Sequence, residues 1–227
     1  MKPWLHKQWI LPGVSAEFVY HMEDVLDLYA EAHDPARPTV CFDESSKQLI
    51  GEVLEPLGVQ PGRVARYDYH YQRNGTRNLF IFFHPLGGWR HLKITEHRKT
   101  EDYAQCMQDL VDIHFPDAEV IRVVQDNLNT HTPWALYETF APEEARRILS
   151  RLEFHYTPKH ASWLNMAEIE FGVLGSQCLK RRIGDEATLR QEVAAWEAER
   201  NAAKATVDWR FTTPKARTKL NRLYPQN

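Results

Sequence analysis

The sequence predicts an α/β domain in which a mixed sheet of five strands is flanked by helices. Three observations lead to this prediction. Apolar runs of strand length occur along the chain, short turns separate the early runs, and segments with helical spacing separate the later ones. The 227 residues are enough for one large domain with a sizeable core.

The chain is expected to open with a helix followed by a strand. Ser15 is placed to cap this helix, and its apolar residues recur at helical spacing: Phe18, Met22, Val25, Leu26 and Tyr29. The prolines within residues 34–38 end the helix. The apolar run at residues 39–42 then predicts a short buried strand with Asp43 at its exit.

The middle of the chain predicts antiparallel strands, then a helix and a further buried strand. Strand-like runs occupy residues 63–71, 78–84 and 89–95, divided by Asn74-Gly75 and by the turn at residues 85–88. Short turns of this kind imply antiparallel pairing, and two or three of these runs are expected to form strands of the sheet. After a helix that starts near residue 100, the apolar run at residues 120–125 leads directly to Asp126.

The remaining elements complete the order of the ribonuclease-H-like fold. A helical stretch at about residues 134–152 precedes a short strand at 154–156, and a long helix is expected from about residue 165 to 182. Asp185 is placed to cap one more helix. In open sheets of this kind ligands gather at the carboxyl ends of strands, where Asp43 and Asp126 are both expected.

Composition limits the classes of partner. The chain carries 28 Lys and Arg against 31 Asp and Glu, so binding to DNA would rest on local patches. The part from Lys159 onward has a basic excess, with 12 Lys and Arg against 8 Asp and Glu. Three cysteines form no CxxC pair, and no apolar run approaches the roughly 18 residues of a membrane span. A cytoplasmic protein without a membrane partner is expected.

Asp43 and Asp126 are candidate metal ligands because each follows an apolar run whose core a charge cannot share. Mg²⁺ prefers oxygen ligands, and a phosphoryl-transfer site needs several carboxylates from separate elements. The alternative is that each aspartate is only a turn or cap residue at a strand end.

Glu168 is the third candidate metal ligand, and its alternative is a structural role as a helix-capping residue. Asn165 and Glu168 have the spacing of a capping box, in which the glutamate bonds back to the Asn165 amide. Gly172 and Gly175 share a helical line with Glu168, and a stripe without side chains permits close approach by a substrate. This stripe favours a Glu168 that faces a cleft.

Several motifs resemble those of the mariner-like bacterial insertion-sequence transposases, members of the DDE superfamily of endonucleases. The first acidic motif is CFDE at residues 41–44, the second is VQDN at 124–127 with His131, and the third is YTPKHASWLNMAE at 156–168. WRFT at 209–212 and ARTKL at 216–220 resemble the family's ending. The resemblance covers nearly all of the chain, although the spacing from Asp126 to Glu168 exceeds the family's usual one.

The resemblance implies a DDE transposase catalytic domain that cleaves DNA at transposon ends and transfers strands to target DNA. Asp43 would bridge two Mg²⁺ ions, for which Mn²⁺ can substitute, while Asp126 and Glu168 each hold one. Double-stranded DNA, and a second copy of the chain in a homodimer, are the implied partners. Residues 1–38, with one helix, resemble the family's linker, and 39–227 its catalytic domain with a basic tail. Recognition of transposon ends is expected to lie in domains ahead of this region.

Further residues are candidates for DNA contact: Asn127, His131, Lys159, His160, Lys180, Arg181 and Arg182. Asn127 and His131 have the alternatives of orienting Asp126 or capping a helix. The three cations 180–182 are expected at the end of the Glu168 helix, where the alternative is a solvated last turn.

Glu44 and Glu170 are expected to point away from the site, because strand alternation and a helical step of about 200° turn them from their neighbours. Two other functions remain open. One is a catalytically silent derivative that keeps the fold for DNA binding or assembly. The other is a nuclease that acts on RNA:DNA hybrids.

Overall fold

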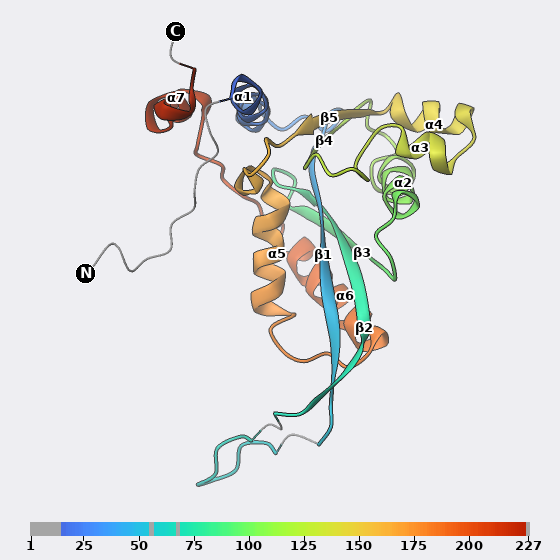
Figure 1. The fold of residues 1–227 in the computed structure, drawn as a ribbon, viewed down its shortest axis with the longest axis vertical. Helices are drawn as coiled ribbons and strands as arrows, with labels where there is room; N and C mark the ends of the chain where they lie inside the picture. Colours follow the sequence, from blue (N-terminus) through green and yellow to red (C-terminus); the bar gives the residue numbers. More distant parts are fainter. Residues whose placement is uncertain (1–14, 55–56, 67–68, 226–227) are drawn as a thin grey trace.

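The computed structural model describes residues 15–54, 57–66 and 69–225 and contains a five-stranded sheet of order β3-β2-β1-β4-β5 (Figure 1). The strands are β1 (Thr39–Glu52), β2 (Tyr71–His84), β3 (Trp89–Thr95), β4 (Ile121–Gln125) and β5 (Leu152–Tyr156). β1, β2 and β3 pair antiparallel, whereas β1, β4 and β5 pair parallel. The mixed sheet predicted from the sequence is therefore confirmed.

Helices cover both faces of this sheet. They are α1 (Ala16–Ala30), α2 (Thr100–Asp109), α3 (Ala135–Thr139), α4 (Pro142–Leu149), α5 (Met166–Gln177), α6 (Glu186–Ala202) and α7 (Thr213–Lys219). One buried cluster joins α1, α5 and α6 to the sheet, and a second joins α2, α3 and α4 to it. Within the described residues, no helix is long and apolar enough to cross a membrane.

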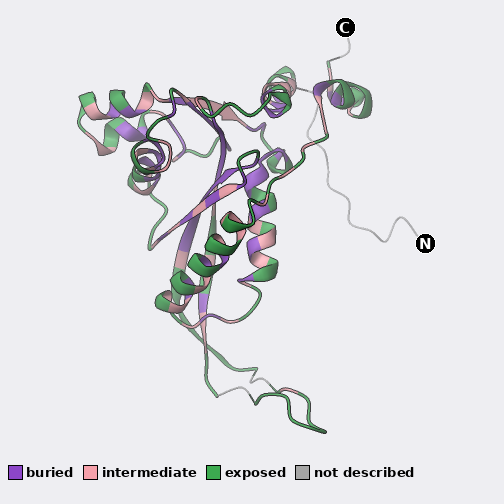
Figure 2. Ribbon diagram, turned by 180° about the vertical axis from the view of Figure 1, so that it is seen from behind, coloured by how far each residue is buried: buried purple, intermediate pink, exposed green. Residues whose placement is uncertain are grey.

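Strand alternation divides the core between the two faces. Cys41 and Ile81 belong to the cluster on the α5 side, whereas Phe42 and Phe82 belong to the cluster on the α2 side. Figure 2 shows the buried residues concentrated along the strands and on the inner surfaces of the helices. The predicted α1 is confirmed, and the Ser15 side chain accepts a hydrogen bond from the Phe18 amide.

β1 is longer than predicted. It does not end at Asp43 but continues to Glu52, because its second half pairs with β2. Its pairing with β4, however, covers only residues 39–41. Asp43 therefore lies inside a strand, at the point where that strand has already lost one neighbour.

The expected strand at residues 63–71 is wrong. Among the described residues of that stretch only isolated bridges form, such as Gln60 with Arg63, and Tyr71 already begins β2. The expected turn at Asn74-Gly75 lies within β2, where Gly75 adopts a φ of 92° that a glycine tolerates. The described apolar side chains between the two strands, such as Val64 and Tyr69, are exposed and do not alternate between a buried and an exposed face.

The long helix expected to reach residue 182 is also shorter. α5 ends at Gln177, and the chain then turns through residues 178–180. Lys180, Arg181 and Arg182 therefore follow the helix in a connecting loop and do not form its last turn. The helical stretch at 134–152 divides into α3 and α4, because Pro142 starts a new helix.

Candidate active site

Three elements place the candidate carboxylates near one another, beside the carboxyl end of β4. Asp43 lies in β1 two residues after its last parallel pair with β4, and Asp126 directly follows the carboxyl end of β4. Glu168 occupies the first turn of α5, which packs on β1 and β2. Asp126 and Glu168 are accessible to solvent, whereas Asp43 lies deeper.

The electrostatics of Asp43 reflect this arrangement. Burial is the main cause of the raised pKa of Asp43, and the charges of Glu44, Asp126 and Glu168 add to it, so that the pKa is about 7. The Glu44 amide donates to Asp43 Oδ1 over 2.8 Å, which acts in the opposite direction. Asp43 is thus a carboxyl group whose ionisation is opposed by two other candidate ligands.

Glu168 does not form the capping box that its spacing allowed. The Asn165 amide donates to Ser162 O over 2.8 Å, and the Asn165 side chain caps α5 through the Ala167 amide. The Glu168 side chain is left exposed on the helical line of Gly172, where an added Cβ would meet no atom of the described residues within 4 Å. The open stripe favoured by the sequence is therefore present in the structure.

His131 lies behind Asp126. Its Nδ1 is 2.6 Å from Asp126 Oδ1, and its Nε2 is 3.0 Å from Glu44 Oε2. Burial lowers the pKa of His131, but the two carboxylates outweigh it and raise the pKa to about 9. The side chain is only 1% exposed, so it is placed to orient Asp126 and not to touch DNA at the surface.

Glu44 is the residue that sequence reasoning underestimated. It lies on the opposite face of β1 from Asp43, as alternation predicts, and yet it reaches the site indirectly through His131. Glu170 points away from the site as expected, and it is buried against Arg90 and Arg200.

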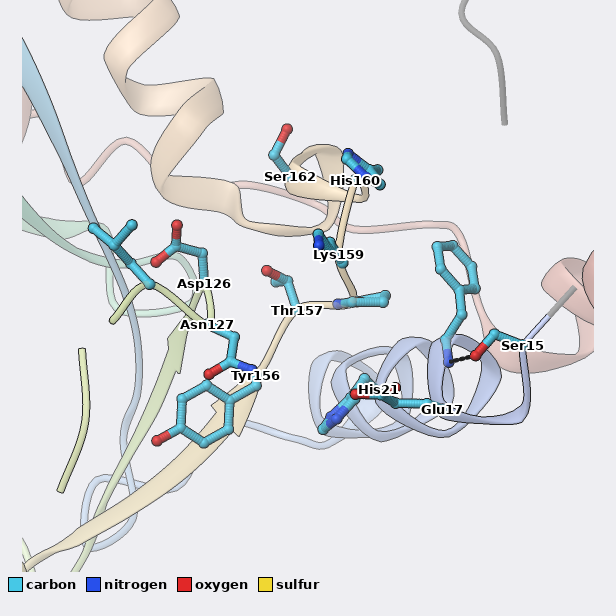
Figure 3. A pocket seen from close by; sticks show the side chains of 13 residues that line it. Ser15, Glu17, His21, Asp126, Asn127, Tyr156, Thr157, Lys159, His160 and Ser162 are labelled. Carbon is cyan, nitrogen blue, oxygen red and sulfur yellow. Dashed lines mark hydrogen bonds between the residues drawn. The ribbon is translucent and has the colours of Figure 1, made fainter. Parts of the chain in front are cut away.

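A cavity of about 550 Å³ opens beside Asp126, between the start of α1 and the loop that follows β5. Figure 3 shows Asn127, Lys159 and His160 around it, together with Tyr156 and residues of α1. Lys159 and His160 are exposed, and His160 adopts a φ of 66°. These three candidate DNA contacts are therefore brought together with one of the carboxylates.

The cations at residues 180–182 are not brought to the carboxylates. They follow the end of α5, whereas Glu168 lies in its first turn. Arg182 forms an ion pair with Glu52 at 2.6 Å, and Arg181 forms one with Glu192. Lys180 is exposed.

The carboxylates fit a divalent cation by their chemistry. Asp43, Asp126 and Glu168 offer the hard oxygen donors that Mg²⁺ prefers, and a cation would relieve the repulsion that raises the pKa of Asp43. Within the described residues, no three His, Cys, Asp or Glu side chains form a ready-made metal cluster. The side chains would thus have to close around a bound ion.

A protein-family profile described as DDE superfamily endonuclease matches residues 38–190, which include all three carboxylates. The chain belongs to this family. No curated protein sequence matches significantly.

Solved structures show the same fold. The Mos1 mariner paired end complex with Mn aligns with a TM-score of 0.56 and 16% identity, over 88% of this chain and 62% of that chain. The Mos1 strand transfer complex gives a TM-score of 0.58 and 15% identity, over 88% and 61%. The paired end complex with Mg gives 0.58 and 14%, over 97% and 67%. This DDE superfamily chain thus spans about three fifths of the Mos1 length in the first two alignments.

Proposed function

We propose that this chain is a transposase catalytic domain that cleaves DNA phosphodiesters at transposon ends and joins them to target DNA. The observation that carries the proposal is that Asp43 lies close enough to Asp126 and Glu168 for both charges to add to the burial that raises its pKa. Family membership adds support, as does the similar fold of Mos1, whose structures include a paired-end complex with transposon end and a strand transfer complex. The resemblance of the three acidic motifs to bacterial insertion-sequence transposases narrows the proposal to that group.

Asp43, Asp126 and Glu168 would hold the two Mg²⁺ ions, and Mn²⁺ would substitute. When bound, such ions activate an attacking water or 3′-hydroxyl and stabilise the leaving oxygen at a phosphodiester. The protein contributes the fixed positions of the carboxylates and the open stripe at Gly172 and Gly175, along which a DNA backbone can approach.

The cavity beside Asp126 is proposed to receive DNA. Lys159 supplies a cation for phosphate, and Asn127 and His160 supply hydrogen-bonding groups at its wall. None of these side chains reads a base sequence by itself, because contacts to phosphate carry no sequence information. Binding by this chain is therefore expected to be weak and indifferent to sequence.

We also propose that the chain pairs with a second copy of itself to form a homodimer. The segment between β1 and β2 projects beyond the sheet (Figure 1) and exposes apolar side chains. Val59 and Val64 are each 79% exposed and Tyr69 is 80% exposed. These exposed apolar side chains are candidates for burial by a second copy of the chain. Sedimentation of the purified chain at several concentrations tests this, and a monomer at every concentration contradicts it.

The proposed activity is tested by nicking of supercoiled plasmid. Mg²⁺ or Mn²⁺ should support nicking, and Ca²⁺ should bind with little turnover because its looser coordination misplaces the reacting oxygens. Full activity in chelator contradicts the proposal. A chain that binds DNA but nicks nothing with either metal is the silent derivative, and cleavage confined to RNA:DNA hybrid identifies the third alternative.

A further inference from the structure

A line of three side chains runs from the α2 side of the sheet to the candidate active site. Glu44 Oε2 lies 3.0 Å from His131 Nε2, and His131 Nδ1 lies 2.6 Å from Asp126 Oδ1. Glu44 and His131 are 6% and 1% exposed, whereas Asp126 is 44% exposed. The line thus begins in the core and ends at the solvent.

The plane of the His131 ring is fixed by its aromatic neighbours. Tyr103 stacks on it with ring centroids 5.0 Å apart, and Phe42 meets it edge to face at 5.3 Å. The backbone of His131 is fixed as well, because its carbonyl oxygen accepts a hydrogen bond from Gln125 Nε2, whose Oε1 is in turn bound by the Tyr103 hydroxyl. The ring can therefore turn only within its plane, and the contacts of its two nitrogens set that rotation.

Glu44 depends on this ring. A buried carboxylate is costly unless it is paired. Among the residues that the structure describes, Glu44 Oε2 has no hydrogen-bond partner beyond its contact with His131. The other oxygen, Oε1, lies 4.0 Å from the exposed Arg98 guanidinium. The imidazole is therefore the principal partner of a carboxylate that has no contact of its own with the solvent-facing site.

We propose that Glu44 is a positioning residue that acts through His131 to fix the carboxylate of Asp126. The inference rests on the proposed role of Asp126 as a metal ligand. With Oδ1 held from behind by the ring, Asp126 keeps Oδ2 for an ion or substrate on the open side. Without Glu44 the ring loses one of its two anchors, and Asp126 can turn out of place.

The test measures Mn²⁺ binding to the full chain without DNA, by the electron paramagnetic resonance signal of free Mn²⁺. Loss of an outer partner of a metal ligand typically weakens affinity by about 10- to 100-fold, which is the range expected for His131→Gln. Glu44→Gln acts one contact further out and should weaken affinity by about 10-fold, at the lower end of that range. The matched control is Glu197→Gln, which removes a Glu–His contact of the same 3.0 Å length, to His91, away from Asp126. This control should bind Mn²⁺ as the wild type does.

A double variant separates positioning from a general loss of structure. In a His131→Gln background, Glu44→Gln should weaken Mn²⁺ binding no further, because its route to Asp126 is already cut. If Glu44→Gln does not fold, Glu44→Asp retains the charge but falls short of the ring, and the same weakening is expected. Wild-type affinity in either folded variant, or an undiminished effect in the His131→Gln background, overturns the inference.

Asp126→Asn distinguishes this inference from the proposed function. If Asp126→Asn leaves Mn²⁺ affinity unchanged, Asp126 is not a ligand and the proposed function fails. If Asp126→Asn weakens binding and the Glu44 variants do not, only the positioning role fails.

Discussion

The side chain of Asn165 donates from Nδ2 to the carbonyl oxygen of Phe42 over 2.8 Å. Its Oδ1 simultaneously accepts from the Ala167 amide over 3.1 Å. Phe42 directly precedes Asp43, and Ala167 directly precedes Glu168. One amide group, 1% exposed, therefore connects the backbones that carry two of the three candidate ligands.

Asn165→Ala should separate these two backbones. It removes both hydrogen bonds and leaves the Phe42 carbonyl without this donor, so stability should fall by about 1 to 3 kcal/mol. Nicking should fall by about tenfold or more beyond any unfolding, because Glu168 shifts relative to Asp43. Urea unfolding and nicking rates measure the two effects. Asp185→Ala, which uncaps α6, is the control, and an equal loss of nicking there contradicts the interpretation.

Asp43→Asn should stabilise the metal-free chain at high pH. The folded pKa of about 7 lies above the unfolded value of about 3.9, so the folded state holds the proton more tightly. Stability contributed by this group is present below pH about 4 and is lost as the pH rises through about 7. Asparagine cannot ionise, and the variant should gain on the order of 1 to 3 kcal/mol over wild type at pH 8.

The measurement is urea unfolding of both proteins in chelator at pH 4 and pH 8. The advantage of Asp43→Asn should be large at pH 8 and small at pH 4. Equal differences at the two values would mean that ionisation of Asp43 does not oppose folding. Asp208→Asn is a suitable control, because Asp208 is exposed and distant in sequence from the carboxylates.

The element order could be predicted because apolar periodicity is local. The run before Asp126 and the Ser15 cap are examples, since each depends on residues close in sequence. The extension of β1 past Asp43 was missed because its residues are mostly polar and show no apolar run. The backbone hydrogen bonds from β2 are enough to keep them in a strand. The end of α5 was missed because apolar residues continue past Gln177 and no proline marks the stop.

Part of the candidate site could also be predicted from local sequence patterns. Apolar runs that end in an aspartate identified Asp43 and Asp126 as candidates, and their roles remain proposals. The contact of Glu44 with His131 spans 87 positions and passes from one strand to a loop, so no local pattern contains it. Alternation correctly placed Glu44 on the face of β1 opposite to Asp43. It could not show that the buried His131 ring connects Glu44 to Asp126.

Glu168→Gln and Glu170→Gln should have opposite effects. Glu168 is exposed and makes no capping bond to Asn165, so Gln should leave the melting temperature nearly unchanged but reduce nicking by several orders of magnitude. Glu170 is buried between Arg90 and Arg200, with each pair at 2.9 Å. Removing one partner of a buried ion pair typically lowers stability by about 3 to 5 kcal/mol, so Glu170→Gln should have a lower melting temperature than the wild type. Below its melting temperature it should retain nicking, and an active Glu168→Gln beside a folded but inactive Glu170→Gln would reverse the assignment.

DNA affinity should depend more on Lys159 than on the cations that follow α5. Lys159 is exposed at the cavity beside Asp126, whereas Arg182 is held by Glu52 at the far end of the helix. A lysine that contacts phosphate releases about one counterion, so Lys159→Gln should flatten the plot of log affinity against log salt by about one unit. Arg182→Gln is the matched control and should change this slope less, because its charge is already neutralised by an ion pair. Fluorescence anisotropy with a labelled duplex at several salt concentrations gives both slopes. A larger change for Arg182→Gln than for Lys159→Gln would indicate that DNA binds at the loop after α5 and not at the cavity.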